Sequence, residues 1–106
     1  MDVTQRLEAM LASGNDSAML RLTLATRYFE GADLDRALRH AEVAVELDAD
    51  YSAAWRLLGK IRSARGDDER AAEAYRQGID VAERRGDRQA AKEMRVFLRR
   101  LPASRK

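Results

Sequence analysis

The chain has 106 residues, of which 36% are charged, 45% are hydrophobic and 6% are aromatic. A chain of this length can bury one core or one short stack of helices, and its abundance of Ala, Leu, Glu and Arg favours helix. Cysteine is absent, which excludes disulfides, thiolate nucleophiles and Cys-ligated zinc. The N-terminus carries Asp2 and Glu8 and no long apolar run. We therefore expect a cytoplasmic protein without a signal peptide or a membrane span.

Charge is distributed unevenly along the chain. The formal net charge is +2. Residues 1–50 hold five arginines against ten acidic residues, residues 51–83 are balanced, and residues 84–106 hold nine basic residues against two acidic ones. The C-terminal end is therefore strongly basic, and the first half is acidic.

Apolar residues recur at helical spacing along almost the whole chain, and six helices fit between the turn signals. The first, at about 3–12, and the last, at about 88–101, each carry one apolar stripe, as in Val3, Leu7 and Met10. The helix at about 17–30 is apolar on more than one side, which predicts an interior helix.

The breaks between these helices have the composition of turns. They lie at Gly14-Asn15-Asp16, Gly31-Ala32-Asp33, Asp48-Ala49-Asp50, Gly66-Asp67-Asp68, Gly86-Asp87 and Pro102. In several of them a glycine suited to a left-handed helix end precedes an aspartate suited to start the next helix. Because these loops are short, we expect each helix to pack antiparallel to the next one in the chain.

The sequence repeats itself at an offset of 34 residues. Bulky and small positions match in turn: Leu24 with Leu58, Ala25 with Gly59, Asp33 with Asp67, Arg36 with Arg70, Ala37 with Ala71, Ala44 with Gly78, and Leu47 with Val81. Small residues at matched points let two helices approach closely, while large side chains fill the space between hairpins.

On these positions the chain resembles the tetratricopeptide repeat family, whose 34-residue helix-turn-helix unit has the pattern W-x2-L-G-x2-Y followed by alanines and a proline. The matching residues of the second copy are Trp55, Leu58, Gly59, Ala71, Tyr75 and Gly78, and those of the first are Leu24, Ala25, Tyr28, Ala37, Ala41 and Ala44. Arg21 stands at the tryptophan position of the first copy, Arg62 replaces the tyrosine of the second, and Ala49 and Glu83 replace the closing prolines.

The resemblance implies an all-α fold, a short right-handed α-solenoid. We expect one domain over 1–106, with an N-terminal capping helix at 3–12, repeats at 18–51 and 52–85, and a C-terminal capping helix at 87–101. Two repeats are fewer than a stable stack usually needs, so the end helices must complete the core.

No pattern for catalysis is present in the sequence. His40 is the only histidine, and neither a zinc-protease motif nor a phosphate-binding glycine loop occurs. We therefore expect no enzymatic activity, no metal and no cofactor, and we interpret His40 as a solvated residue on a helix surface.

The resemblance further implies a concave groove, lined by the first helix of each hairpin, that holds a peptide or a partner's helix. The residues expected there are Met19, Leu22, Thr26 and Phe29; Arg56, Lys60 and Ser63; and Gln89, Lys92, Val96 and Arg99. An apolar end and a basic end suit an acidic peptide with a hydrophobic anchor. Two alternatives stay open: the apolar residues are core, and the cations form a solvated face.

A non-catalytic adaptor that binds another protein is therefore the leading hypothesis. Nucleic-acid binding is a second one, and its phosphate contacts would come from Arg84, Arg85, Arg88, Arg95, Arg99, Arg100, Arg105 and Lys106. Phe97 is the only aromatic residue among these bases, which argues against it. A third is weak self-assembly, in which the acidic half of one copy meets the basic end of another.

Overall fold

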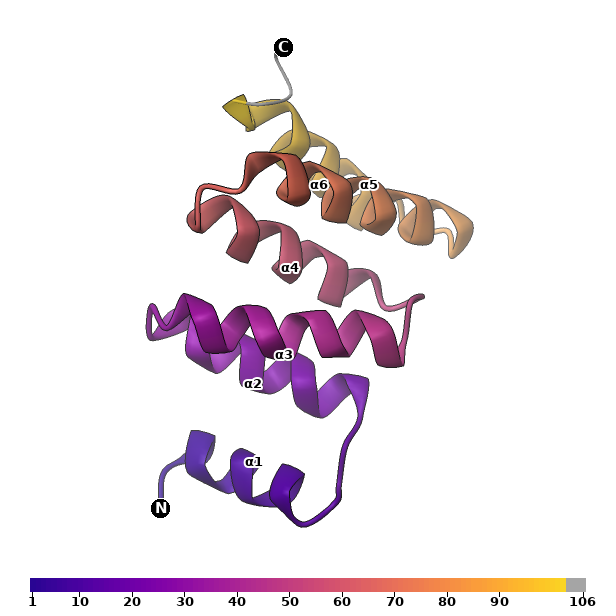
Figure 1. The fold of residues 1–106 in the computed structure, drawn as a ribbon. Helices are drawn as coiled ribbons and strands as arrows, with labels where there is room; N and C mark the ends of the chain where they lie inside the picture. Colours follow the sequence, from indigo (N-terminus) through magenta and orange to yellow (C-terminus); the bar gives the residue numbers. More distant parts are fainter. Residues whose placement is uncertain (103–106) are drawn as a thin grey trace.

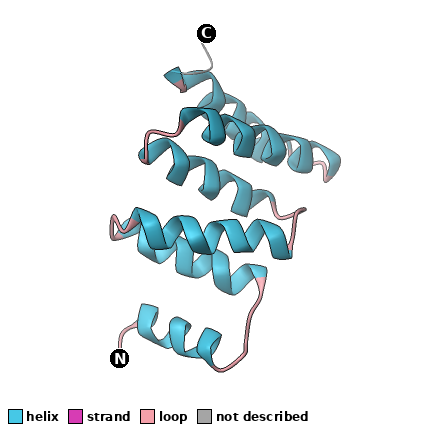
Figure 2. Cartoon of the chain, in the orientation of Figure 1, coloured by secondary structure: helices cyan, strands magenta, loops and turns pink. Residues whose placement is uncertain are grey.

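The computed structural model describes residues 1–102, and these residues form six helices and no strand (Figure 2). The all-α fold is therefore confirmed. The helices are α1 (Val3–Ala12), α2 (Ala18–Glu30), α3 (Leu34–Leu47), α4 (Ser52–Ala64), α5 (Asp68–Arg84) and α6 (Arg88–Arg100).

The helices pair into antiparallel hairpins that stack in one direction. α2 packs along α3 and α4 along α5, and α6 packs against α5. α4 also contacts both α2 and α6, so these three helices form one layer, with α3 and α5 behind them. The stack measures 44 × 29 × 19 Å, with α1 at one end and α6 at the other (Figure 1).

Polar side chains start most of the helices, as the turn signals predict. Ser17, Asp33, Asp67 and Asp87 each accept a hydrogen bond from the backbone N–H three residues later. Asp2 does the same for Gln5, whose side chain in turn accepts from the Asp2 N–H. Each such cap satisfies a donor that the first turn of a helix leaves unpaired.

The chain reverses through left-handed residues. Gly14, Gly66 and Gly86 have positive φ angles, which glycine adopts without steric cost. In the turn after α2, however, the left-handed residue is Ala32, with φ 61°, while Gly31 has φ −86°. The 34-residue offset pairs Ala32 with Gly66, so the first hairpin makes the same turn with a less suitable residue.

The core consists of small residues on one helix facing large ones on the next. Leu24, Leu58 and Ile61 are fully buried, among alanines of α2, α3 and α5. Gly59 is buried where α4 meets α5: a Cβ built there would lie 2.4 Å from Cε1 of Tyr75. Ala71 is also buried, so the expected nesting of small and bulky residues is confirmed.

His40 is not the surface residue that the sequence suggested. It is 9% exposed, and its ring is stacked on Tyr28 with centroids 5.6 Å apart and planes at 4°. Nδ1 lies 3.1 Å from Nη1 of Arg21, and Nε2 lies 3.6 Å from Oε2 of Glu8. The prediction was wrong because it considered only the α3 stripe that faces α4, whereas α1 and α2 cover the adjoining side.

Candidate functional site

A hollow lies between α2 and α4 in the layer that the family resemblance assigns to the groove. It has a volume of about 310 Å³. The residues that line it are Leu22, Thr26, Phe29, Glu30, Ala53, Arg56, Leu57 and Lys60. The structure thus brings together Leu22, Thr26, Phe29, Arg56 and Lys60, five of the residues that the sequence assigned to the groove.

The apolar residues of this hollow belong to the core as well as to the surface. Leu22, Phe29 and Leu57 are half-buried, and each packs against the buried cluster beneath it. Each of these side chains therefore contacts the core on one side and faces the hollow on the other. The contacts with the buried cluster hold the side chains in place, so the apolar wall of the hollow is ordered.

Both cations of the hollow are held by contacts from α6. Arg56, 41% exposed, donates a hydrogen bond of 2.8 Å from Nη1 to Oε1 of Glu93. Lys60 places Nζ 5.0 Å from the centroid of the Phe97 ring, a cation–π distance. The positive charges are therefore positioned at the border between α4 and α6.

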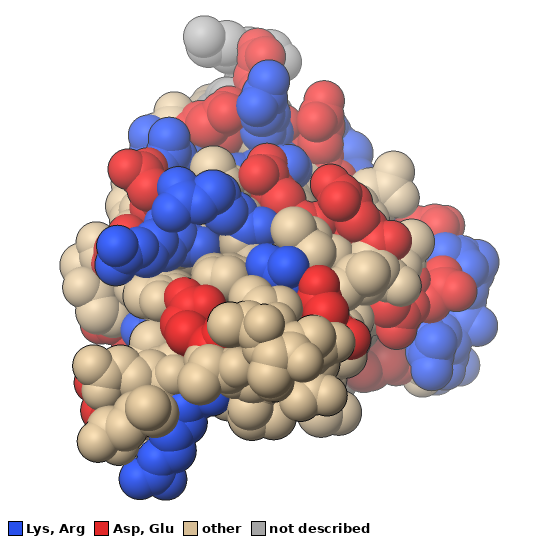
Figure 3. Space-filling model, turned by 60° about the horizontal axis from the view of Figure 1, so that its bottom comes forward, with Lys and Arg blue, Asp and Glu red and all other residues tan. Residues whose placement is uncertain are grey.

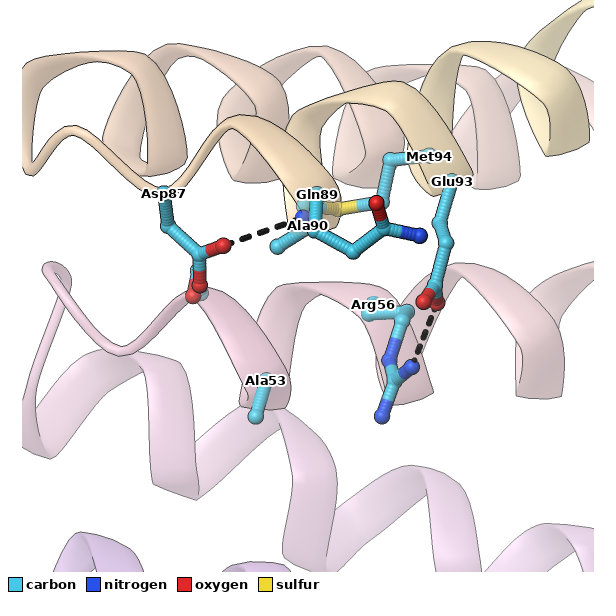
Figure 4. Close-up of a pocket in the computed structure, with 8 residues that line it drawn as sticks. Ala53, Arg56, Asp87, Gln89, Ala90, Glu93 and Met94 are labelled. Atoms are coloured by element: carbon cyan, nitrogen blue, oxygen red, sulfur yellow. Dashed lines mark hydrogen bonds and ion pairs between the residues drawn. The ribbon is translucent and has the colours of Figure 1, made fainter.

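A second hollow, of about 240 Å³, continues the first between α4 and α6 (Figure 4). Arg56 and Ala53 line both hollows. The remaining lining residues are Ser52, Asp87, Gln89, Ala90, Glu93 and Met94. Arg56 extends from α4 towards Glu93 on α6, so it stands between an apolar hollow and one that carries carboxylates.

The structure places only part of the α6 residues expected in the groove beside these hollows. Gln89 lines the second hollow, whereas Lys92 lines a different one, and Val96 and Arg99 line none of the described hollows. α6 begins 36 residues after α4, and Lys92 likewise follows Arg56 by 36 residues, so the difference does not come from the repeat spacing. The α6 residues that face α4 across the second hollow are Gln89, Ala90, Glu93 and Met94.

Glu93 lines the second hollow but is not among the residues that the sequence assigned to the groove. Its place follows from its ion pair with Arg56 on α4, a contact between helices that the repeat spacing does not indicate.

Two further predicted residues lie elsewhere. Met19 is 69% exposed and lines a separate hollow beside Asp50, Tyr51 and Arg85. Ser63 is half-buried near the end of α4 and lines none of the hollows that the structure describes.

Part of the positive charge near the C-terminus is paired with carboxylates of the same molecule. Arg84 pairs with Asp80 and Asp50, at 3.1 and 3.3 Å, and Arg95 pairs with Glu83. Arg105 and Lys106 lie outside the described residues. Intramolecular carboxylates thus neutralise part of the charge on which nucleic-acid binding was based.

Within residues 1–102 no three His, Asp or Glu side chains are grouped as metal ligands would be. None of the helices in this part of the chain is both long enough and apolar enough to cross a membrane.

No protein-family model matches the chain. A TPR repeat-containing protein of Pseudomonas aeruginosa, however, is 50% identical to it over 99 residues, which are 93% of this chain and 94% of that protein. The chain belongs to the tetratricopeptide repeat family. The TPR resemblance that the 34-residue pattern suggested is thereby confirmed.

Solved structures agree with this TPR assignment. The solution structure of a protein from Bordetella parapertussis is 46% identical, has a TM-score of 0.81, and matches 95% of this chain and 88% of its own. A tetratricopeptide repeat domain protein from Salinibacter ruber is 27% identical, with a TM-score of 0.76 over 83% of this chain and 89% of its own. Proteins with TPR repeats are generally protein-interaction modules, and the fold is generally non-enzymatic.

Proposed function

We propose that this TPR protein binds a short peptide segment of another protein in the hollow between α2 and α4. The observation that carries the proposal is that Leu22, Phe29 and Leu57 form one wall of this hollow while Arg56 and Lys60 stand at its edge. The preferred ligand has an apolar side chain followed by carboxylates.

The apolar wall supplies most of the binding energy. Burial of one large apolar side chain is worth about 1.5–3 kcal/mol. Because the wall is anchored on the buried cluster beneath it, little side-chain entropy is lost when a ligand binds.

The two cations supply the selectivity. A guanidinium can bind a carboxylate through two parallel hydrogen bonds, and an ammonium adds a further charged donor. Glu30 lies at the α2 side of the same hollow, so a second carboxylate of the ligand is disfavoured there. The ligand's carboxylates therefore lie at Arg56 and Lys60, away from Glu30, and its apolar part packs against Leu22, Phe29 and Leu57.

The test is calorimetric titration with synthetic peptides. One set carries a single Leu, Phe or Trp followed by Asp and Glu residues, and the matched set carries Asn and Gln in their place with an amidated C-terminus. We expect the acidic set to bind, and the double variant Arg56→Glu, Lys60→Glu to lose at least about tenfold in affinity.

The double variant Arg39→Glu, Arg76→Glu is the matched control, because it makes the same change in net charge with two exposed residues outside the hollow. It should bind like the unmodified protein. Equal affinities for the acidic and amide sets, or an unchanged affinity in the Arg56, Lys60 variant, would exclude this site.

A further inference from the structure

A stripe of cations runs along α6 on a different side from the groove. Arg88, Lys92, Arg95 and Arg99 follow one another at spacings of four, three and four residues, so they lie on one face of the helix over about 16 Å. All four side chains are exposed.

Three of these residues line a hollow of about 540 Å³ at the end of α5. Arg88, Lys92 and Arg95 form its sides together with Glu83, and the small residues Gly86 and Ala91 complete its lining. Since Ala91 is 1% exposed, the surface beneath the cations is shallow and tightly packed.

The positive charge of this hollow is only partly neutralised. Arg95 donates a hydrogen bond to Glu83, so the hollow already accommodates one carboxylate. Arg88 and Lys92 make no ion pair within residues 1–102. By contrast, Arg56 and Arg65 are each paired with an acidic residue on another helix.

The cations lie on the side of α6 that corresponds to the side of α4 covered by α5. In the α4–α5 hairpin, Gly59 admits the Tyr75 ring of the second helix at close contact. The residue 36 positions later, at the equivalent turn of α6, is Arg95. Arg95 keeps a helix from packing on α6 as closely as α5 packs on α4, so a helix on this side of α6 lies further out and can place a carboxylate beside the guanidinium.

We propose that this face of α6 is a docking surface for an acidic helix of a partner protein, which lies where the second helix of a third hairpin would lie. Carboxylates at positions i, i+4 and i+7 of such a helix share the spacing of Arg88, Lys92 and Arg95. Small side chains between them fit against Ala91 and Gly86. This surface is separate from the α2–α4 hollow.

A helix fits the surface better than a nucleic acid does. The residues that line the hollow include no aromatic ring on which a base could stack. The spacing of the cations is also that of one helix face and not of a phosphate backbone.

A second copy of this chain is not the expected occupant. Seen from the α1 end of the stack, the surface nearest the viewer is mainly uncharged (Figure 3). Val3 and Met10 of α1 are each 46% exposed, and Glu8 already accepts a hydrogen bond from Tyr28. The end of the molecule opposite α6 therefore offers little charge complementarity.

The test uses a capped helical peptide of about 15 residues, cross-linked to hold its helix, with glutamates at i, i+4 and i+7 on an alanine background. Its affinity is measured by fluorescence anisotropy at about 50 mM and 150 mM salt, and its site is mapped by the backbone amide shifts of the protein. We expect binding that shifts the amides of residues 88–95 and leaves those of residues 22–29 unchanged. The variant Arg88→Glu, Lys92→Glu should weaken it at least tenfold.

One protein variant and one peptide serve as controls. The variant Arg39→Glu, Arg76→Glu should stay within about twofold of the unmodified protein. A peptide of equal composition with its glutamates spread around the helix should bind at least fivefold more weakly. Absence of binding, equal losses in the two variants, equal affinity for the two peptides, tighter binding of duplex DNA, or a dimer formed through α6 would each overturn the proposal.

Discussion

Arg56 and Glu93 form an ion pair that joins α4 to α6. Nη1 of Arg56 donates a hydrogen bond of 2.8 Å to Oε1 of Glu93, and the two side chains are 41% and 39% exposed (Figure 4). Glu93 therefore occupies a donor position of the guanidinium that the carboxylate of the proposed peptide would otherwise use. In the proposed complex the two carboxylates compete for the same cation.

Replacement of Glu93 by Gln should strengthen binding of the acidic peptides. An exposed ion pair is worth up to about 1 kcal/mol, so the gain should reach at most about fivefold in affinity. Calorimetric titration of the variant measures it. Glu73→Gln is the matched control, since Glu73 is an exposed residue of α5 outside both hollows. A gain of the same size in the Glu73 variant would show an effect of net charge only.

Gly59 has no space for a side chain. Its Cβ would lie 2.4 Å from Cε1 of Tyr75, in a packed region where the ring has little room to move. We expect Gly59→Ala to lower the free energy of unfolding by about 1–2 kcal/mol, even though alanine favours helix. In Gly31→Ala the new Cβ meets nothing closer than 3.6 Å, so urea unfolding should show a change below about 0.5 kcal/mol. Equal stabilities for both variants would contradict the close contact.

Leu58 and Trp55 lie on one helix but differ in burial. Leu58 is fully buried, whereas Trp55 is half-buried and donates a hydrogen bond of 2.8 Å from Nε1 to the Ala49 carbonyl. Leu58→Ala should cost about 2–5 kcal/mol because it leaves a cavity between hairpins. Trp55→Ala should cost less, since solvent can fill part of the space. Urea melts that rank the two variants in the opposite order would refute this placement.

The fold could be predicted from the sequence because its information is local and repeated. Small residues at Gly59 and Ala71, large ones at Leu58 and Tyr75, and Asp67 after Gly66 each specify part of one hairpin, and the 34-residue offset repeats several of them. Because the same pattern of small and large residues occurs twice, the sequence predicts two similar hairpins stacked on each other.

The hollow between α2 and α4 follows the repeat. Leu22, Phe29, Arg56 and Lys60 lie on α2 and α4, which are 34 residues apart, and they meet in one hollow. On α6, Glu93 lines the neighbouring hollow and Lys92 does not, because the side that this last helix turns towards α4 depends on its packing against α5 and α4. The burial of His40 could not be read from the sequence, because it depends on how α1 packs on α2 and brings Glu8 to the imidazole.

Ala32 holds a backbone conformation that glycine adopts more easily. Its φ is 61°, and this region costs a residue with a side chain about 1–2 kcal/mol. Ala32→Gly should therefore raise the free energy of unfolding by about 0.5–1 kcal/mol, because the higher chain entropy that glycine gives the unfolded state offsets only part of the relieved strain. Gly66→Ala, at the matched turn with φ 83°, should lower it by a similar amount. If thermal unfolding shows that Ala32→Gly and Gly66→Ala change the stability in the same direction, the backbone of Ala32 is not strained.

The environment of His40 favours its neutral form. Burial lowers the pKa of His40, the Glu8 carboxylate acts in the opposite direction, and the cations Arg21 and Arg39 add to the lowering. On the neighbouring helix, the hydrogen bond to Glu8 and burial raise the pKa of Tyr28, which keeps that ring neutral as well. Arg21, paired with Asp16 at 2.9 Å, remains charged beside the imidazole.

Stability should therefore decrease as the solution is acidified below about pH 6.5. The histidine of the unfolded chain has a pKa near 6.5, so in that range the unfolded chain binds a proton that the folded chain does not. As the pH is lowered, the free energy of unfolding therefore decreases by at most about 1.4 kcal/mol per pH unit. The decrease ends at the lower pKa of the folded state, and above pH 6.5 this group gives no dependence. Urea unfolding between about pH 7.5 and pH 5.5 measures the slope, and His40→Gln should remove it. The same slope in both proteins would mean that another group titrates in this range.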